Sequence, residues 1–447
     1  MGTLYSKEGV SILIRNLCLN PHIRYLYVWG NSPLSKTPYG LAGQNLLKEV
    51  WLRKDSEEIH KEIDREVVKK VIQNVKLIDI SEVELKSLDQ YLLSQINQTS
   101  NPYMEPQEFP EAVRDTSKPF PSEEIGFSVH GNTLYQTWLK TVDKILRYGI
   151  VKQTESGTNQ KELQNISWTI ENEDNDNPFF PDLPPRVSEH IGFTKDAKDE
   201  YKKIFLDTKL PKGVVYTYGN RLGDYIGKVN QIEEMIQHIK KHAGTRRAVA
   251  ITFYPPEDIQ HTSPPCLTFI QILTTADNRI NMIAMFRSHD IMKAAIPNSF
   301  GLLNLHEFIS QNTSYKRGKL SIISTSAHIY EEEWEMAEDI VKCGIRERIK
   351  IQFDEKTDTD PRGYTRIRIR DDKIVLELVT PLGEVLHELV EDNARAMIMK
   401  LAKLDLLSRP DHYADVTIEL IKAEIAMKKK IPYLQDRVIE IDGITIK

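Results

Sequence analysis

Residues 246–273 read RRAVAITFYPPEDIQHTSPPCLTFIQIL. Two apolar runs in this stretch, Ala248–Phe253 and Leu267–Leu273, have the β-branched and aromatic content of strands, and a proline-rich loop separates them. Cys266 therefore stands at the start of a predicted strand, directly after a turn. This order predicts a sheet in which a turn and a strand end hold the cysteine.

The surroundings of Cys266 distinguish it from an ordinary cysteine, which is usually a small buried apolar residue. Pro264 and Pro265 fix the backbone before it, and the pair Arg246-Arg247 brings positive charge that favours a thiolate and binds phosphate. A solvated arginine pair after a helix is the alternative. Conjugate addition to an electrophilic ring needs a thiolate and polar groups that stabilise the enolate. Cys266 is therefore the candidate nucleophile.

The composition is that of a globular protein with two or three domains: 447 residues, 40% hydrophobic and 28% charged. A net charge of -6 and a pI near 6.1 argue against nucleic-acid binding, so any phosphate site must be local. Three widely spaced cysteines exclude a disulfide framework and a CxxC metal site, and we expect no metal and a cytoplasmic location. No apolar run reaches the roughly 18 residues of a membrane span, so we expect no membrane association.

Patterning along the chain predicts four segments. They are an α/β domain at 1–95, a linker at 96–130 that is rich in Pro, Glu, Ser and Asn, a catalytic domain at 131–350 around Cys266, and a C-terminal domain at 351–447. In the last segment, the pattern of apolar residues predicts a hairpin of Tyr364–Arg370 with Lys373–Thr380. Helices are predicted to follow at Asp392–Leu406 and His412–Lys429.

Six short motifs follow one another around Cys266. They are Tyr218-Gly219, Arg246-Arg247, Pro265-Cys266, Arg287-Ser288-His289-Asp290, Pro297-Asn298 and His328-Ile329-Tyr330. Each is weak alone, but in this order they resemble the motif series of thymidylate synthases, and the short archaeal enzymes in particular. The resemblance covers residues 131–350. It implies an α+β fold, a mixed sheet packed against helices, whose other face meets a second subunit in a homodimer.

The resemblance also implies roles in the reductive methylation of dUMP. Cys266 attacks C6 of the pyrimidine. Arg287 contacts both the phosphate and the thiolate, and Ser288 donates a hydrogen bond to the phosphate. Arg246 and Arg247 reach across the dimer interface to the phosphate bound by the partner subunit.

Contacts to the base, the sugar and the co-substrate follow from the same resemblance. Asn298 reads the uracil edge, because an amide pairs with both O4 and N3–H, whereas the dCMP hydroxymethylase branch carries aspartate there. His328 and Tyr330 hold the deoxyribose hydroxyl. Asp290 faces the pterin, and Tyr218 takes part in removing the proton from C5.

The chain departs from the family pattern at the loop that gives an arginine to the phosphate. The corresponding stretch, Lys152–Thr158, contains no arginine, and Arg147 and Arg221 are the candidate replacements. Leu267 stands where the family has a histidine after the nucleophile. The segment Phe179–Lys212 is short and lacks the family's tryptophans.

That short segment should also supply the glutamate that relays protons to the uracil and the pterin. Glu200, on a predicted helix, is the best match, and a solvated surface carboxylate is the equal alternative. The co-substrate implied by the family is methylene-tetrahydrofolate or methylene-tetrahydromethanopterin. The other functions considered are a dCMP hydroxymethylase and a non-catalytic pterin- or corrinoid-binding module.

The flanking segments resemble other proteins. Residues 16–45 resemble part of the corrinoid-carrying subunit of tetrahydromethanopterin S-methyltransferase, but His22 is interpreted as a surface residue rather than a cobalt ligand. Asp360–Tyr364 and His412–Asp415 resemble an uncharacterised domain found beside that module. This domain displaces the free C-terminus, whose carboxylate helps to close the active site in ordinary thymidylate synthases.

Overall fold

The computed structural model describes most of the chain in two units, residues 1–117 and 118–447. The described residues are 4, 6–30, 41–54, 58–95, 101–110, 119–155, 157–174, 176–346, 359–380, 382–441 and 443–446. The predicted boundary at 350/351 and parts of the predicted linker lie outside them. No helix within these ranges is both long and apolar enough to cross a membrane.

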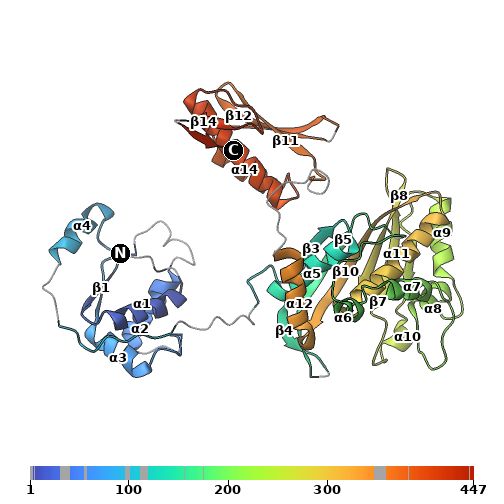
Figure 1. Cartoon of the computed structure of the whole chain (residues 1–447), viewed down its shortest axis with the longest axis horizontal. Coiled ribbons are helices and arrows are strands. Elements are labelled where there is room, and N and C mark those ends of the chain that lie inside the picture. Colours follow the sequence, from blue (N-terminus) through green and yellow to red (C-terminus); the bar gives the residue numbers. More distant parts are fainter. Residues whose placement is uncertain are drawn as a thin grey trace. The chain divides into compact units, whose positions relative to one another are not determined.

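The first unit is a small α/β domain (Figure 1). Its elements are α1 (Glu8–Leu19), β1 (Tyr25–Val28), α2 (Ala42–Arg53), α3 (Arg65–Asn74), β2 (Lys76–Asp79) and α4 (Leu85–Ser94). β1 and β2 pair in parallel, with Tyr25 opposite Lys76. Buried aliphatic side chains of α1, α2 and α3 form its core.

A mixed sheet organises the second unit (Figure 1). The strand order is β3 (Ile125–Gly131), β5 (Asn159–Ile170), β10 (Lys316–Tyr330), β8 (Arg279–Phe286), β7 (Leu267–Thr274) and β6 (Val249–Ile251). Two short strands join it, β4 (Ile150–Gln153) beside β5 and β9 (His289–Asp290) beside β10. β10 runs antiparallel to β5 and parallel to β8, so the predicted mixed sheet is confirmed.

One face of this sheet packs against α5 (Leu134–Tyr148) and α11 (Ala295–Gln311). Side chains alternate along the strands, so Met282, Ala284 and Phe286 of β8 are fully buried, whereas Ile283 and Met285 between them are only partly buried. Met285 pairs with Phe269 on one side and with Ile323 on the other, and both are also partly buried. The opposite face is therefore an apolar surface that this chain leaves incompletely covered.

Further helices surround the sheet. They are α6 (Pro185–His190), α7 (Lys195–Ile204), α8 (Tyr218–Gly223), α9 (Gln231–Lys241), α10 (Pro255–Asp258) and α12 (Trp334–Val341). Asn230 caps α9 by accepting a hydrogen bond from the amide of Glu233, which explains why the helix begins there. α7 packs against α11, where Gly301 lies against the buried ring of Phe205.

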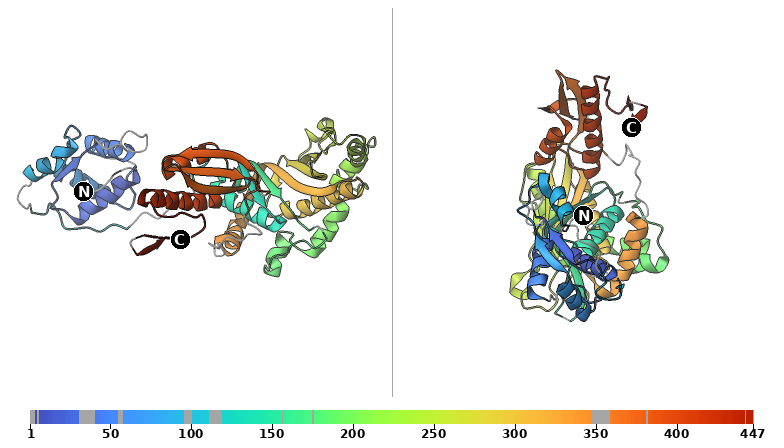
Figure 2. Two further views of the ribbon diagram at one scale, coloured as in Figure 1. Left: turned by 90° about the horizontal axis from the view of Figure 1, so that it is seen from above. Right: turned by 90° about the vertical axis from the view of Figure 1, so that its left-hand side faces the viewer.

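The C-terminal part of the second unit has its own apolar core. Its elements are β11 (Tyr364–Arg370), β12 (Lys373–Val379), β13 (Val385–Glu391), α13 (Ala394–Lys403), α14 (Pro410–Lys429), β14 (Ile439–Ile441) and β15 (Ile444–Ile446). The predicted hairpin turns at Asp371 and Asp372, which both have positive φ. β13 was not predicted, although it completes a three-stranded sheet with α14 along one face (Figure 2).

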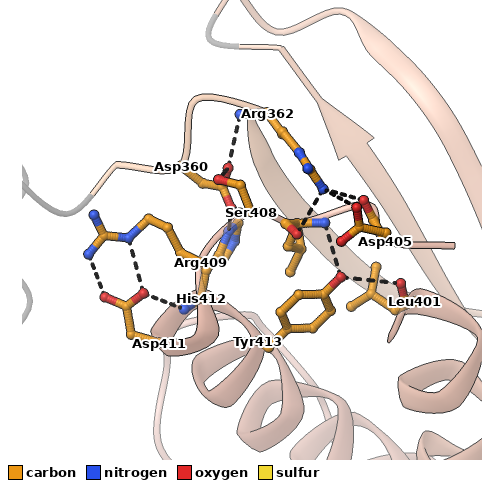
Figure 3. Close-up of polar contacts among 10 residues, drawn as sticks. Asp360, Arg362, Leu401, Asp405, Ser408, Arg409, Asp411, His412 and Tyr413 are labelled. Atoms are coloured by element: carbon orange, nitrogen blue, oxygen red, sulfur yellow. Dashed lines mark hydrogen bonds and ion pairs between the residues drawn. The ribbon is translucent and has the colours of Figure 1, made fainter. Parts of the chain in front are cut away.

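Asp360 joins the two sequence motifs of this C-terminal part (Figure 3). Its Oδ1 accepts from the amide of Arg362 at 2.9 Å and from the hydroxyl of Ser408 at 2.7 Å. Its Oδ2 accepts from the amide of Ser408 at 2.8 Å and from Nδ1 of His412 at 3.0 Å. Burial alone would raise the pKa of Asp360, but these hydrogen bonds outweigh burial and hold the pKa at about 2. The carboxylate therefore ties the chain before β11 to the start of α14.

Replacing Gly301 with alanine should destabilise the second unit. An added Cβ would overlap the ring of Phe205, which is fully buried and packs against Tyr218. We expect a loss of about 1–3 kcal/mol, seen as a lower melting temperature. Gly244→Ala is the control, because its Cβ would meet only the exposed His242. An unchanged melting temperature for Gly301→Ala would contradict this packing.

Asp360→Asn should loosen the C-terminal part by about 2 kcal/mol, because the buried charge that accepts four hydrogen bonds is lost. Since the pKa of the folded state lies below the ordinary 3.8, this stabilisation is present above pH 3.8 and is lost as pH falls towards 2. Amide exchange of a peptide covering residues 404–416 measures the effect. Asp405→Asn, which alters an exposed ion pair with Arg362, is the control and should change exchange little.

Candidate active site

Cys266 lies at the start of β7, where the side chain of Arg287 binds the turn that precedes it. Nε of Arg287 donates to the carbonyl of Pro265 at 3.0 Å, and Nη2 donates to that of Pro264 at 2.7 Å. Nη2 also lies 3.8 Å from Sγ of Cys266, and the amide of Arg287 donates to the carbonyl of Cys266 at 2.8 Å. The guanidinium thus fixes the turn and the nucleophile together.

Burial and two neighbouring charges set the protonation of Cys266. Burial raises the pKa of the thiol, the guanidinium of Arg287 lowers it, and the carboxylate of Asp290 raises it again. The net direction is upward, so most of the sulfur carries its proton near neutral pH.

The turn after β8 buries the side chain of His289, and this leaves its two polar neighbours, Ser288 and Asp290, nearer the surface. His289 points into the core, where its ring stacks on Phe286 at 3.9 Å and its Nδ1 lies 2.8 Å from the hydroxyl of Ser324. Burial, with His328 as a further contribution, lowers the pKa of His289 to about 3, so the ring is neutral. Ser288 and Asp290, its neighbours in the chain, are only partly buried.

Asp290 holds the turn before α11 and faces the end of β10. Its Oδ1 accepts from the amides of Met292 at 3.1 Å and Lys293 at 2.9 Å. His328 is its register partner across β9 and β10, and the ring of His328 meets that of Tyr330 edge-on at 5.1 Å. Burial lowers the pKa of His328, whereas Asp290 raises it. The sheet therefore gathers Cys266, Asp290, His328 and Tyr330 in one region. The charges of Asp290 and Cys266 are close enough to Tyr330 to raise its pKa.

Tyr218 begins α8, with Thr217 as the N-cap residue. Its hydroxyl accepts from the amide of Leu267 at 3.2 Å, directly after the nucleophile, and burial raises its pKa. Tyr216, which was not assigned to the site from the sequence, also lies close to it. Burial, followed by the charge of Cys266, raises the pKa of Tyr216, and Arg287 lowers it. The alternation Tyr216-Thr217-Tyr218 is the signal that could have paired the two tyrosines.

Known proteins share the sequence that builds this site. Residues 158–375 match the family model described as Thymidylate synthase. A protein of Methanosarcina barkeri named "Putative thymidylate synthase" is 32% identical over 219 residues, which are 49% of this chain and 96% of that protein. The chain belongs to the thymidylate synthase family. A protein of the same name from Methanothermobacter thermautotrophicus is 33% identical over 224 residues, 49% of this chain and 100% of that protein.

The C-terminal residues 359–436 match a second model, described as PterinBD-DUF4346, a pterin-binding domain. It contains both motifs that Asp360 joins, so the domain expected from Asp360–Tyr364 and His412–Asp415 is present. The likeness of residues 16–45 to the methyltransferase stays a prediction. Residues 31–40 of that stretch lie outside the described part of the chain.

The remaining site residues predicted from the thymidylate synthase resemblance lie on several elements. Asn298 is buried on α11, at 6% exposed. Arg246 and Arg247 are exposed before β6, and the side chain of Gln271 donates to the carbonyl of Arg246 at 3.0 Å. Glu200 is exposed on α7. The roles in binding and catalysis that the resemblance implies for these residues stay predictions.

The loop that lacks the family's arginine follows β4, and the two candidate replacements have partners of their own. Arg147 forms an ion pair with Asp143 one helical turn away. Arg221 is 4% exposed and donates to Asp258 at 2.9 Å. Each arginine therefore has a counter-charge of its own. Within the described residues, no group of three His, Cys, Asp or Glu side chains could hold a metal ion.

Arg287→Gln should slow alkylation of Cys266 by iodoacetamide several-fold at pH 8. Since Arg287 is the group that lowers the pKa of this thiol, its loss shifts the pH midpoint of the reaction upward. Peptide mass spectrometry follows the modification of Cys266. Arg279→Gln is the control, because Arg279 pairs with Asp277 on an exposed turn. An unshifted midpoint in Arg287→Gln would refute the electrostatic role.

Proposed function

We propose that the protein is a thymidylate synthase that converts dUMP to dTMP with methylene-tetrahydrofolate or methylene-tetrahydromethanopterin. The observation that carries this proposal is the contact between Arg287 and Cys266, in a chain that belongs to the thymidylate synthase family. The guanidinium is close enough to the sulfur to stabilise a thiolate. A cytoplasmic location stays a prediction.

In the proposed reaction, Sγ of Cys266 adds to C6 of the uracil and the electron pair of the C5–C6 bond moves to O4 as an enolate. C5 then bonds to the one-carbon unit, which the pterin supplies together with a hydride. A base removes the proton from C5, and Tyr218, whose hydroxyl lies beside the amide of Leu267, is the candidate. With the loss of that proton, the bond between the one-carbon unit and the pterin nitrogen breaks and an exocyclic methylene forms at C5. Hydride from the tetrahydropterin then completes the methyl group, the pterin leaves at the dihydro level, and Cys266 leaves as the thiolate.

Phosphate recognition would use arginines from both subunits. Arg287 and Ser288 would bind the phosphate, and Arg246 and Arg247 would reach the phosphate of a partner subunit. The partly buried apolar face around Met285 supports a homodimer, because monomers seldom leave such a surface uncovered. The exposure of Arg246 and Arg247 is compatible with that arrangement.

The base and sugar contacts distinguish the proposed activity from its nearest alternative. Asn298 would pair with O4 and N3–H of uracil, while His328 and Tyr330 would bind the deoxyribose hydroxyl. A dCMP hydroxymethylase would add water instead of hydride, and Asn298 argues against it. A non-catalytic pterin- or corrinoid-binding module would have no use for the contact between Arg287 and Cys266.

The pterin-binding domain at the C-terminus supports a pterin co-substrate. Asp290 would face the pterin in the synthase site, and we propose that the C-terminal domain binds a pterin of its own. Glu200 would relay protons only if its exposed side chain turned towards the substrate.

Tritium release from [5-³H]dUMP tests the proposal with each methylene-pterin in turn. We expect release with at least one pterin and none above background from Cys266→Ala, because the covalent step is lost. Cys343→Ala is the control, since Cys343 is exposed and has no part in the proposed site. Asn298→Asp should lower turnover of dUMP at least tenfold relative to dCMP (about 1.4 kcal/mol). No release with either pterin would contradict the synthase.

A further inference from the structure

Glu333 is a buried carboxylate close to the proposed active site. It ends the short 3₁₀ turn Glu331–Glu333 before α12 and is 1% exposed. Its Oε1 accepts from Nε2 of His190 at 2.7 Å. Its Oε2 is buried and has no hydrogen-bond partner among the described residues. A buried carboxylate oxygen without a donor is costly, which points to a donor from outside the chain.

An open depression of about 540 Å³ lies over this carboxylate. Its lining comes from α6 and from the segment around α12, and consists of Arg186, Glu189, His190, Glu332, Glu333 and Met336. The volume falls in the range that holds a small heterocycle. The unpartnered oxygen and the depression are separate observations that point to the same place.

The depression adjoins the residues of the proposed reaction. Lys293 has its Nζ 2.5 Å from Glu332 and 3.8 Å from Glu333, and the same Nζ lies 6.0 Å from the ring centre of Tyr330. The amide of Lys293 donates to Asp290 at 2.9 Å. Asp290 is also close enough to Glu333 for its charge to raise the pKa of Glu333. A ligand in the depression would therefore have one end near Asp290.

The lining selects the chemistry of that ligand. Three carboxylates, Glu189, Glu332 and Glu333, disfavour an anion, although Arg186 stands at the rim. Oε2 of Glu333 can only accept a hydrogen bond while it is ionised, so the ligand must present N–H groups. The aminopyrimidinone ring of a pterin presents its 2-amino group and N3–H side by side, which suits a carboxylate. Met336 offers a soft apolar surface to a flat ring.

We propose that Glu333, oriented by His190, accepts the 2-amino and N3–H edge of the reduced pterin in this depression, as a second acidic contact beside Asp290. The inference rests on the proposed function, because that function makes a reduced pterin the co-substrate. It assigns Glu333, rather than the exposed Glu200, as the glutamate that meets the pterin. His190 is a positioning residue, since it acts through Glu333.

Hydrogen exchange of the full chain tests this site without turnover. The probes are 5-formyltetrahydrofolate and tetrahydromethanopterin, and the readout is protection of peptides covering residues 185–193 and 330–338. This local readout separates the depression from the C-terminal pterin-binding domain. We expect protection in the wild type, and in Glu333→Gln a midpoint concentration raised about tenfold or more. Glu331→Gln is the matched control, because Glu331 is exposed on the same turn and does not line the depression, and it should keep the wild-type midpoint.

Kinetics supply a second readout. Glu333→Gln should raise the KM for the methylene-pterin about tenfold and leave the KM for dUMP unchanged. If Glu333→Gln does not fold, His190→Gln replaces it, since His190 is partly exposed at 33%. Wild-type protection by both probes in a folded Glu333→Gln protein, or equal loss in Glu331→Gln, would overturn the inference. Glu333-dependent protection without tritium release would support this site and contradict only the proposed synthase activity.

Discussion

The contact of Arg287 with the turn before Cys266 is the interaction on which the proposed site depends. Proline has no backbone N–H, so Pro264 and Pro265 cannot donate to a neighbouring strand, and their carbonyls need a donor from elsewhere. One guanidinium satisfies both carbonyls and still reaches the sulfur of Cys266. The same group therefore shapes the turn and opposes the rise in the thiol pKa that burial causes.

The long strand β10 supports this contact from the side of β8 that lies away from β7. It pairs with β8 and β9 in parallel, which sets His328 opposite Asp290. Its Ser324 accepts a hydrogen bond from the indole of Trp168 and contacts the buried ring of His289. β10 therefore both packs the core and positions polar side chains of the site. Side chains alternate along a strand, so those that point into the core fix the direction of those between them.

Much of the site could be predicted because local sequence chemistry determines it. Two prolines before an apolar run indicated the turn at Cys266. Glu333 could not be found in this way. The partner of Glu333 is His190, 143 residues earlier in the chain, and only the fold brings the two together and buries the carboxylate. β13 was missed because its side chains are mostly exposed and lack clear apolar alternation.

Covalent trapping on Cys266 tests the central claim most directly. With 5-fluoro-dUMP and a methylene-tetrahydropterin, the adduct should persist, because fluorine at C5 cannot leave as a cation in place of the proton. Peptide mass spectrometry should then find the nucleotide and the pterin together on the peptide that contains Cys266. An adduct on Cys18 or Cys343, or formation of dTMP by a protein in which Cys266 never reacts, would contradict the account.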